Sequence, residues 1–141
     1  EAVAIAMHFV NSQEQGPLSV TDNTVNDIID RTITLIEHHF NVTVDRKEYS
    51  YNRFVMHLRY YLKRIQNDDQ ITDGSSQTLI NTFREQEPKV YRCTKDIVVM
   101  IDDLLHTNST DDEMFYLMIY VSRIVKKSLL EQNQIGGYDN G

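Results

Sequence analysis

The 141-residue sequence contains one cysteine, no tryptophan, two prolines and five glycines. A single cysteine, Cys93, excludes an internal disulfide framework and suits a reducing compartment. Because proline and glycine are scarce, few positions force a helix to end. No stretch of useful length alternates apolar and polar residues as a half-buried strand would. The sequence therefore predicts an all-α fold.

Long apolar runs are also missing. The most apolar stretch, Phe115–Val121, is much shorter than the roughly 18–20 residues needed to cross a bilayer. No signal peptide is visible, because the chain enters a helical pattern directly after Glu1. We therefore expect a cytoplasmic protein without membrane insertion. Since the first residue is not methionine, we expect the chain to be a fragment of a longer protein.

Positive charge is in deficit overall, with 14 Lys and Arg against 21 Asp and Glu, a net charge of −7 and a pI of about 5.1. This balance argues against direct binding to a nucleic-acid backbone. Six of the 14 basic residues nevertheless fall within Arg46–Arg64, where Glu48 is the only carboxylate. This segment is where we expect an anion to bind.

Apolar residues recur at helical spacing in five stretches. Asp45-x-x-Glu48 and Thr110-x-x-Glu113 are capping-box patterns that predict helix starts, and Pro88 suits the first turn of a helix. The predicted helices are Thr21–Phe40, Tyr51–Ile65, Ser76–Gln86, Pro88–Leu105 and Thr110–Glu131. The residues predicted to be buried are Val25, Ile28, Ile29, Thr32 and Ile36; Phe54, Leu58, Tyr61 and Ile65; Leu79, Ile80 and Phe83; and Val90, Cys93, Ile97, Val98, Ile101 and Leu105.

Gly16-Pro17 marks the one domain boundary. The pattern of residues 1–11 predicts a helix that is apolar almost all round, which we interpret as the end of a preceding domain. The predicted organisation is 1–16 as that helix and a linker, 17–131 as the main domain, and 132–141 as a flexible tail. The first residues align with the stretch that begins at Glu113, and His8 and Tyr120 both stand seven residues after the glutamate. The alignment predicts two copies of this domain in tandem.

The helix over Tyr51–Ile65 places Arg53, His57, Tyr60 and Arg64 on one face, next to the stripe that it buries. A histidine at the edge of the core can stay accessible while flanking arginines donate charge-assisted hydrogen bonds to a phosphoryl group on it. A hydrogen-bonded histidine with no reactive role is the alternative that these residues leave open.

The other candidates favour structural roles. His38 and His39 are adjacent and point in different directions, so they do not form a metal site, and like His106 they suit the C-terminal end of a helix dipole. Cys93 lies within an apolar stripe. No glycine-rich phosphate loop and no isolated carboxylate pair is present. We therefore predict no catalytic residues, no metal and no cofactor, and a protein that is not an enzyme.

Three motifs carry a family resemblance. RFVMHLRYYLKR at 53–64, PKVYRC at 88–93 and DEMFYLMIYVSR at 112–123 follow the order of the motifs RFVTHLKFFAQR, P-x-A-Y-x-C and DE-x-x-YL-x-IHI-x-R. These are motifs of the PTS-regulation domain, or PRD, of BglG/SacY-type bacterial transcriptional antiterminators. EAVAIAMHFVNS at 1–12 is similar to the closing motif of the first PRD in such proteins. The chain therefore resembles a second PRD preceded by the last helix of the first.

The resemblance implies a five-helix bundle that forms a homodimer. It implies phosphorylation on histidine by the phosphocarrier protein HPr and by a sugar-specific enzyme II, and RNA binding only through an N-terminal domain that this chain lacks. By position, His57 matches the first acceptor of the second PRD, and His8 matches the second acceptor of the first.

Four residues are expected to support a phosphoryl group on His57. Arg64 and Arg123 match arginines that accompany the acceptors, and Arg53 shares the face of His57. Tyr120 stands where the family motif has histidine. A tyrosine cannot take part in phosphohistidine transfer, so we expect its hydroxyl to donate a hydrogen bond and the domain to have one acceptor.

Two other functions fit the same sequence. The chain could be the PRD of a DNA-binding sugar-operon activator, in which further domains follow the PRDs; the glycine-containing tail soon after Arg123 favours an antiterminator. It could also be a non-phosphorylated helical dimerisation scaffold with inert histidines. Phosphorylated HPr would label the domain in the first two cases and not in the third.

Overall fold

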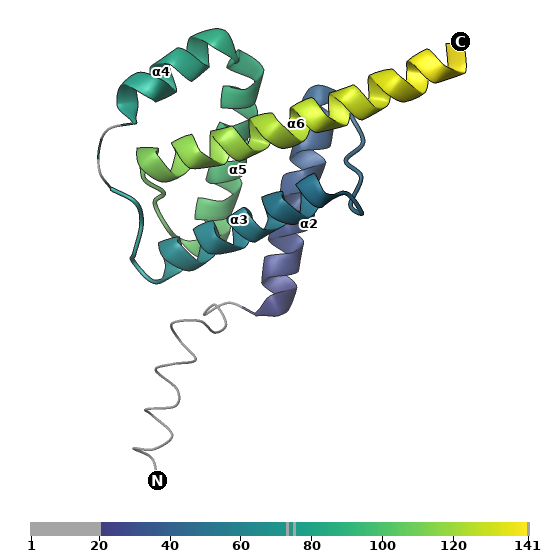
Figure 1. Cartoon of the computed structure of the whole chain (residues 1–141). Helices are drawn as coiled ribbons and strands as arrows, with labels where there is room; N and C mark the ends of the chain where they lie inside the picture. The colour runs from purple at the N-terminus through teal and green to yellow at the C-terminus, as the bar shows by residue number, and fades with distance from the viewer. Residues whose placement is uncertain (1–20, 73, 75, 141) are drawn as a thin grey trace.

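The computed structural model describes residues 21–72, 74 and 76–140. All regular elements within these ranges are helices, which confirms the predicted all-α fold (Figure 1). The helix predicted over residues 1–11, with His8 and the boundary at Gly16-Pro17, lies outside the described residues. The helices are α2 (Asp22–Phe40), α3 (Tyr49–Gln66), α4 (Gln77–Gln86), α5 (Pro88–Leu105) and α6 (Asp111–Asn140).

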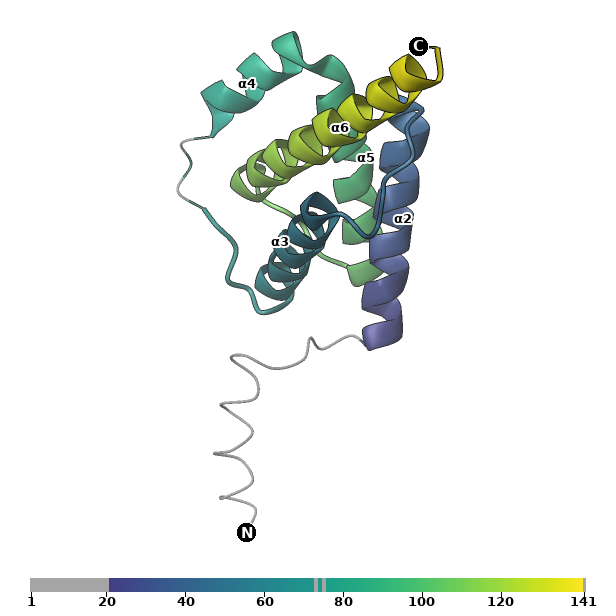
Figure 2. The same ribbon diagram turned by 45° about the vertical axis from the view of Figure 1, so that its right-hand side comes forward.

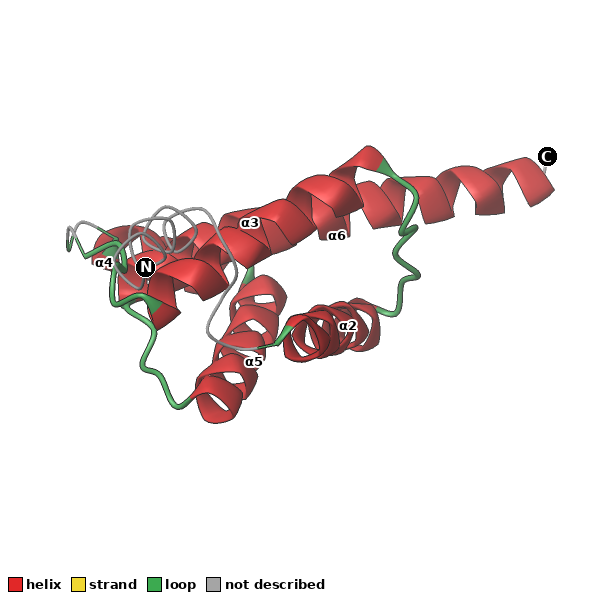
Figure 3. Ribbon diagram, turned by 90° about the horizontal axis from the view of Figure 1, so that it is seen from below, coloured by secondary structure: helices red, strands yellow, loops and turns green. Residues whose placement is uncertain are grey.

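The four long helices form two pairs that cross. Helices α3 and α6 lie side by side, and α2 lies beside α5 with the opposite chain direction (Figures 1 and 2). Seen from below, the α3–α6 pair extends across the view while α2 and α5 are seen nearly end-on (Figure 3). The short α4 packs against α5 and α6 at one end of the bundle.

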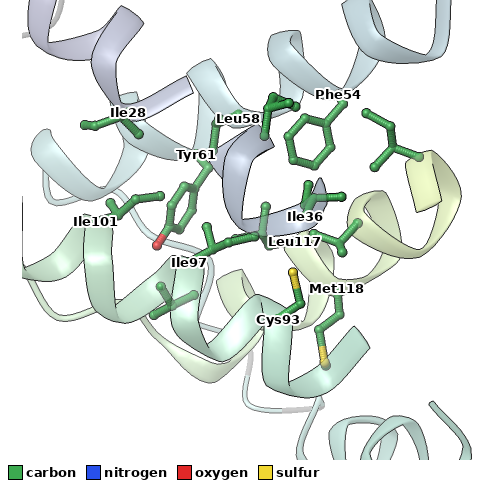
Figure 4. Close-up of a cluster of buried hydrophobic side chains, with 14 of the residues drawn as sticks. Ile28, Ile36, Phe54, Leu58, Tyr61, Cys93, Ile97, Ile101, Leu117 and Met118 are labelled. Carbon is green, nitrogen blue, oxygen red and sulfur yellow. The ribbon is translucent and has the colours of Figure 1, made fainter. Parts of the chain in front are cut away.

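The core lies between the two pairs (Figure 4). Of the residues predicted to be buried, all on α2 and α3 and all but Leu105 on α5 are buried, and Leu62 and Met118 join them. Leu105 is half-buried. Leu79 is 47% exposed, contrary to prediction, because the ten-residue α4 contacts the bundle along one side and buries Ile80 there.

The predicted helix starts are partly confirmed. Thr21 caps α2 by accepting a hydrogen bond from the Thr24 amide at 3.2 Å, and Pro88 occupies the first turn of α5. The Asp45-x-x-Glu48 capping box is wrong: the Asp45 carboxylate accepts from the Lys47 amide at 2.9 Å. The side chain is thus used in its own turn, so α3 begins after Glu48 without a side-chain cap.

Helix α6 is longer than the sequence predicts. The pattern places its end near Glu131 and a flexible tail over 132–141, whereas the helix continues to Asn140. No proline interrupts this stretch, and an existing helix gains one hydrogen bond for each residue added, so Gly136 and Gly137 weaken it without ending it. Despite this length, neither α6 nor any other described helix is apolar enough to span a membrane.

Candidate functional site

The seam between α3 and α6 brings the candidate residues together. The rings of His57 and Tyr120 are stacked, with centroids 3.8 Å apart and an interplanar angle of 13°. Seven residues later on α3, Arg64 contacts Glu113, which stands seven residues earlier on α6. These two contacts show that the helices are antiparallel. Tyr60, at 52% exposed, does not take part in the seam.

His57 is half-buried in this seam. Burial, followed by the positive charges of Arg53, Arg123 and Arg64, lowers its pKa below the ordinary value of 6.5. The imidazole is therefore neutral at pH 7, with a lone pair on one ring nitrogen. Its Nε2 atom is buried and has no hydrogen-bond partner among the described residues. A neutral ring of this kind can act as a nucleophile.

Two arginines next to His57 make no ion pair with any described residue. The guanidinium of Arg53 lies 5.6 Å from the ring centroid of Tyr49, and that of Arg123 lies 5.7 Å from the ring centroid of Tyr120. A pocket of about 180 Å³ lies between these groups, with Phe54 on its wall. Cations held on aromatic faces keep their hydrogen-bond donors available for an anion.

Arg64 is in a different state, because its charge is already paired. Its Nε and Nη2 atoms each donate to the carboxylate of Glu113 at 2.7 Å. The Glu113 side chain is fully buried and Arg64 is 31% exposed. The hydrogen bond to Glu113 raises the pKa of Arg64 further. The sequence pattern treats Arg53 and Arg64 as equivalent neighbours of His57, and the structure separates them.

The model of the family described as the PRD domain matches residues 30–124, which include all of these contacts. The chain belongs to the PRD domain family. Curated relatives agree: the chain is 28% identical over 128 residues to the transcription antiterminator LicT of Bacillus subtilis (strain 168), covering 91% of this chain and 46% of LicT. It is 25% identical over 118 residues to protein GlcT of Staphylococcus aureus, covering 83% of this chain and 40% of GlcT. The chain thus spans less than half the length of these relatives.

Glu113 has a role in this PRD that its sequence pattern does not predict. The sequence pattern predicts it only as a capping residue, and the Thr110 hydroxyl does accept from its amide at 3.2 Å. Its carboxylate does not accept the reciprocal hydrogen bond from the Thr110 amide, because that amide donates to Gln70 Oε1 at 2.7 Å. The contact follows from the register between the two helices: once His57 is opposite Tyr120 in an antiparallel pair, Arg64 must lie opposite Glu113.

Two further histidines of the described PRD, His39 and His106, have structural roles. His39 Nε2 lies 2.9 Å from the Asp96 carboxylate, joining α2 to α5. His106 follows the last residue of α5 with φ 57°, and its amide donates to Asp102, so it ends the helix as a left-handed cap. Burial raises the pKa of the Cys93 thiol to about 12, so the thiol stays protonated and unreactive at neutral pH.

Three carboxylates meet where α3 begins beside the C-terminal half of α6. The oxygens of Asp45, Glu48 and Glu131 lie within 4.8 Å of one another. A hydrogen bond that the protonated Glu131 carboxyl donates to Glu48 raises the pKa of Glu131, the pattern of two carboxyl groups that share a proton. Asp45 is exposed and the other two are half-buried.

Proposed function

We propose that this chain is the phosphorylation-controlled regulatory domain of a transcriptional antiterminator, and that His57 accepts the phosphoryl group. One observation carries the proposal: within a PRD, a neutral histidine is stacked on Tyr120 beside two arginines, Arg53 and Arg123, that have no described counter-ion. The similarity to a relative named as a transcription antiterminator supports the proposal that the parent protein controls transcription in this way.

The chemistry is a transfer between two imidazoles. A nitrogen lone pair of neutral His57 attacks the phosphorus of a phosphohistidine on the donor. The donor N–P bond breaks as an N–P bond forms on His57, and the donor imidazole leaves with its electron pair. A protonated donor ring leaves as neutral imidazole, while the acceptor ring becomes a phosphoimidazolium, so charge balances. The phosphoryl group carries a charge of about −1.5 to −2, which Arg53 and Arg123 can neutralise.

The position of Nε2 adds one requirement. Because this atom is buried in the unphosphorylated domain, transfer to it needs the His57 ring to turn or the Tyr120 ring to move aside. Tyr120 is the stacking partner of His57, and its hydroxyl can donate a hydrogen bond. It cannot receive a phosphoryl group as a histidine would. The domain therefore has one acceptor on the described seam.

The donors in this proposal are HPr and a sugar-specific enzyme II, and the responding assembly is a homodimer. RNA binding belongs to an N-terminal domain of the parent protein. The role of the chain is regulatory rather than enzymatic: it receives the phosphoryl group and transmits the resulting change to that domain. Sedimentation velocity of the chain before and after phosphorylation would measure the dimerisation directly.

Incubation with phosphorylated HPr, followed by intact-mass measurement, tests the acceptor. We expect one phosphoryl group on the wild-type chain, none on His57→Ala, and one on Tyr120→Phe, which keeps the stacked ring. His39→Ala is the matched control for loss of a histidine elsewhere, and His8→Ala should change the yield little. Two phosphoryl groups on the wild type, or one that survives His57→Ala, would show that His57 is not the acceptor.

A further inference from the structure

The connection between α3 and α4 is tied to the start of α6. We define the 70–74 segment as Gln70, Ile71, Thr72 and Gly74 of this connection, which passes the end of the bundle where α6 begins (Figure 1). Five hydrogen bonds join it to residues 108–113. They are Gln70 Nε2 to Asn108 O at 2.8 Å, Ile71 N to Glu113 Oε2 at 3.0 Å, Gly74 N to Asp112 Oδ2 at 2.8 Å, Thr110 N to Gln70 Oε1 at 2.7 Å and Thr110 Oγ1 to Ile71 O at 2.7 Å.

Glu113 is the acceptor that this segment shares with Arg64. Its Oε2 atom accepts both the Arg64 Nε donor and the Ile71 amide, while Oε1 accepts from Arg64 Nη2. The side chain of Glu113 is fully buried, so Arg64 is the cation that makes its charge tolerable there. The position of Arg64 therefore decides whether the Ile71 amide keeps its acceptor.

Arg64 also interacts electrostatically with the stacked rings of His57 and Tyr120. Side chains of a helix lean toward its N-terminus, so Arg64 leans from its own turn toward that of His57. Its positive charge contributes to lowering the pKa of His57, and the Tyr120 hydroxyl contributes to raising the pKa of Arg64. Arg64 thus acts electrostatically on His57 and is hydrogen-bonded to the buried carboxylate of Glu113.

We propose that Glu113 links His57 to the 70–74 segment: a phosphoryl group on His57 draws Arg64 away from Glu113, and the segment is then released from the start of α6. This inference rests on the proposed function of His57. A phosphoryl dianion carries more charge than a carboxylate and offers three acceptor oxygens to one guanidinium. A carboxylate that has lost its counter-ion does not stay buried. It turns to water or binds a proton, and the Ile71 amide loses its partner in the first case.

Release of this segment changes the domain beyond the seam. The segment leads directly into α4, which packs on α5 and α6 at the same end of the bundle. With the hydrogen bond from the Ile71 amide to Glu113 broken, the segment that leads to α4 is held less firmly, and the exposed face of α4, which includes Leu79, can take a new position. A charge on one residue would in this way become a change of surface.

Backbone hydrogen exchange of the full chain tests the link in two independent arms. In the first, phosphoramidate phosphorylates histidines without any protein donor: its P–N bond breaks, ammonia leaves and an N–P bond forms on imidazole. We expect the Ile71 and Gly74 amides to exchange at least about tenfold faster in the phosphorylated wild type, and not in His57→Ala treated in the same way. Ile97, in the core of α5, should be unchanged in both.

The second arm removes the cation without phosphorylation. Arg64→Met should speed Ile71 exchange as phosphorylation does, whereas Arg59→Met, a matched loss of an exposed arginine on α3, should not. If Ile71 stays protected in Arg64→Met, or in a chain shown by mass to be phosphorylated on His57, the inference is wrong. Failure of phosphorylated HPr to label His57 would instead contradict the proposed function, and the Arg64→Met result would stand apart from it.

Discussion

Replacing Arg64 with methionine isolates the energetic role of the buried carboxylate. The substitution keeps an unbranched side chain in the seam and removes two charge-assisted hydrogen bonds to Glu113, each 2.7 Å long. Removing one partner of a buried ion pair costs about 3–5 kcal/mol, because the other charge is left uncompensated. Arg64 is 31% exposed, so water can replace part of what it supplies. We therefore expect a loss of about 3 kcal/mol in the free energy of unfolding.

The reverse substitution should cost less. In Glu113→Leu the charge that remains is the guanidinium, which is partly exposed and can turn to water, so we expect a loss of about 1–2 kcal/mol, mainly from the Ile71 amide. The double variant Arg64→Met/Glu113→Leu contains no buried charge. It should be more stable than Arg64→Met alone, by about 1 kcal/mol or more.

Urea unfolding of the four proteins at pH 7, followed by circular dichroism, gives the free energies and their coupling. The dependence of the unfolding free energy on urea concentration should be equal in all four, since the same surface is exposed on unfolding. The order of stability is the decisive result. If the double variant is less stable than Arg64→Met, the cost of Arg64→Met does not come from an uncompensated Glu113 carboxylate, and our account of the pair is wrong.

Three further predictions concern residues away from this pair. The pKa of His57 is lower in the folded chain than the value of 6.5, so its contribution to stability is full above about pH 6.5 and is lost as the pH falls through the lower, folded pKa; urea unfolding should show a greater loss between about pH 7.5 and 5 in the wild type than in His57→Gln. Cys93, with its pKa raised to about 12, should react with iodoacetamide at about pH 8 only in proportion to the unfolded fraction, and mass spectrometry across a urea series would reveal any reaction of the folded chain. His106→Gly should raise the free energy of unfolding by about 0.5–1 kcal/mol, because glycine adopts the φ of 57° without strain; an unchanged or lower urea midpoint would contradict this.

The helices and their buried faces could be predicted because both follow from local periodicity. A face that recurs every 3.6 residues is a property of one segment, and on α2 and α3 that face is the buried one. The ends of helices were less predictable. Asp45 has the sequence of a capping residue and caps its own turn, and nothing between Glu131 and Asn140 ends α6. A short polar side chain has several nearby amides to choose from, and sequence spacing alone does not select one.

The candidate site divides in the same way. The face of α3 that carries Arg53, His57 and Arg64 is local, so its residues could be identified from spacing. Which of these arginines has a counter-ion depends on the register between α3 and α6, since the partner carboxylate belongs to a residue 49 positions away. The contact of Glu113 with Ile71 also depends on the course of the α3–α4 connection, for which the sequence carries no periodic signal.

The two ends of the seam differ in whether their arginines are paired with a carboxylate. At the end near the start of α3, Arg53 and Arg123 lie on aromatic rings and have no described counter-ion; at the other end, Arg64 is held by a buried carboxylate. His57 and Tyr120 lie between them. An incoming anion therefore meets available donors first, and can engage Arg64 only by competing with Glu113. In our proposal the same type of residue thus serves two purposes: the arginines without a described counter-ion stabilise the incoming phosphoryl group, and the paired arginine transmits its charge to the buried Glu113 carboxylate.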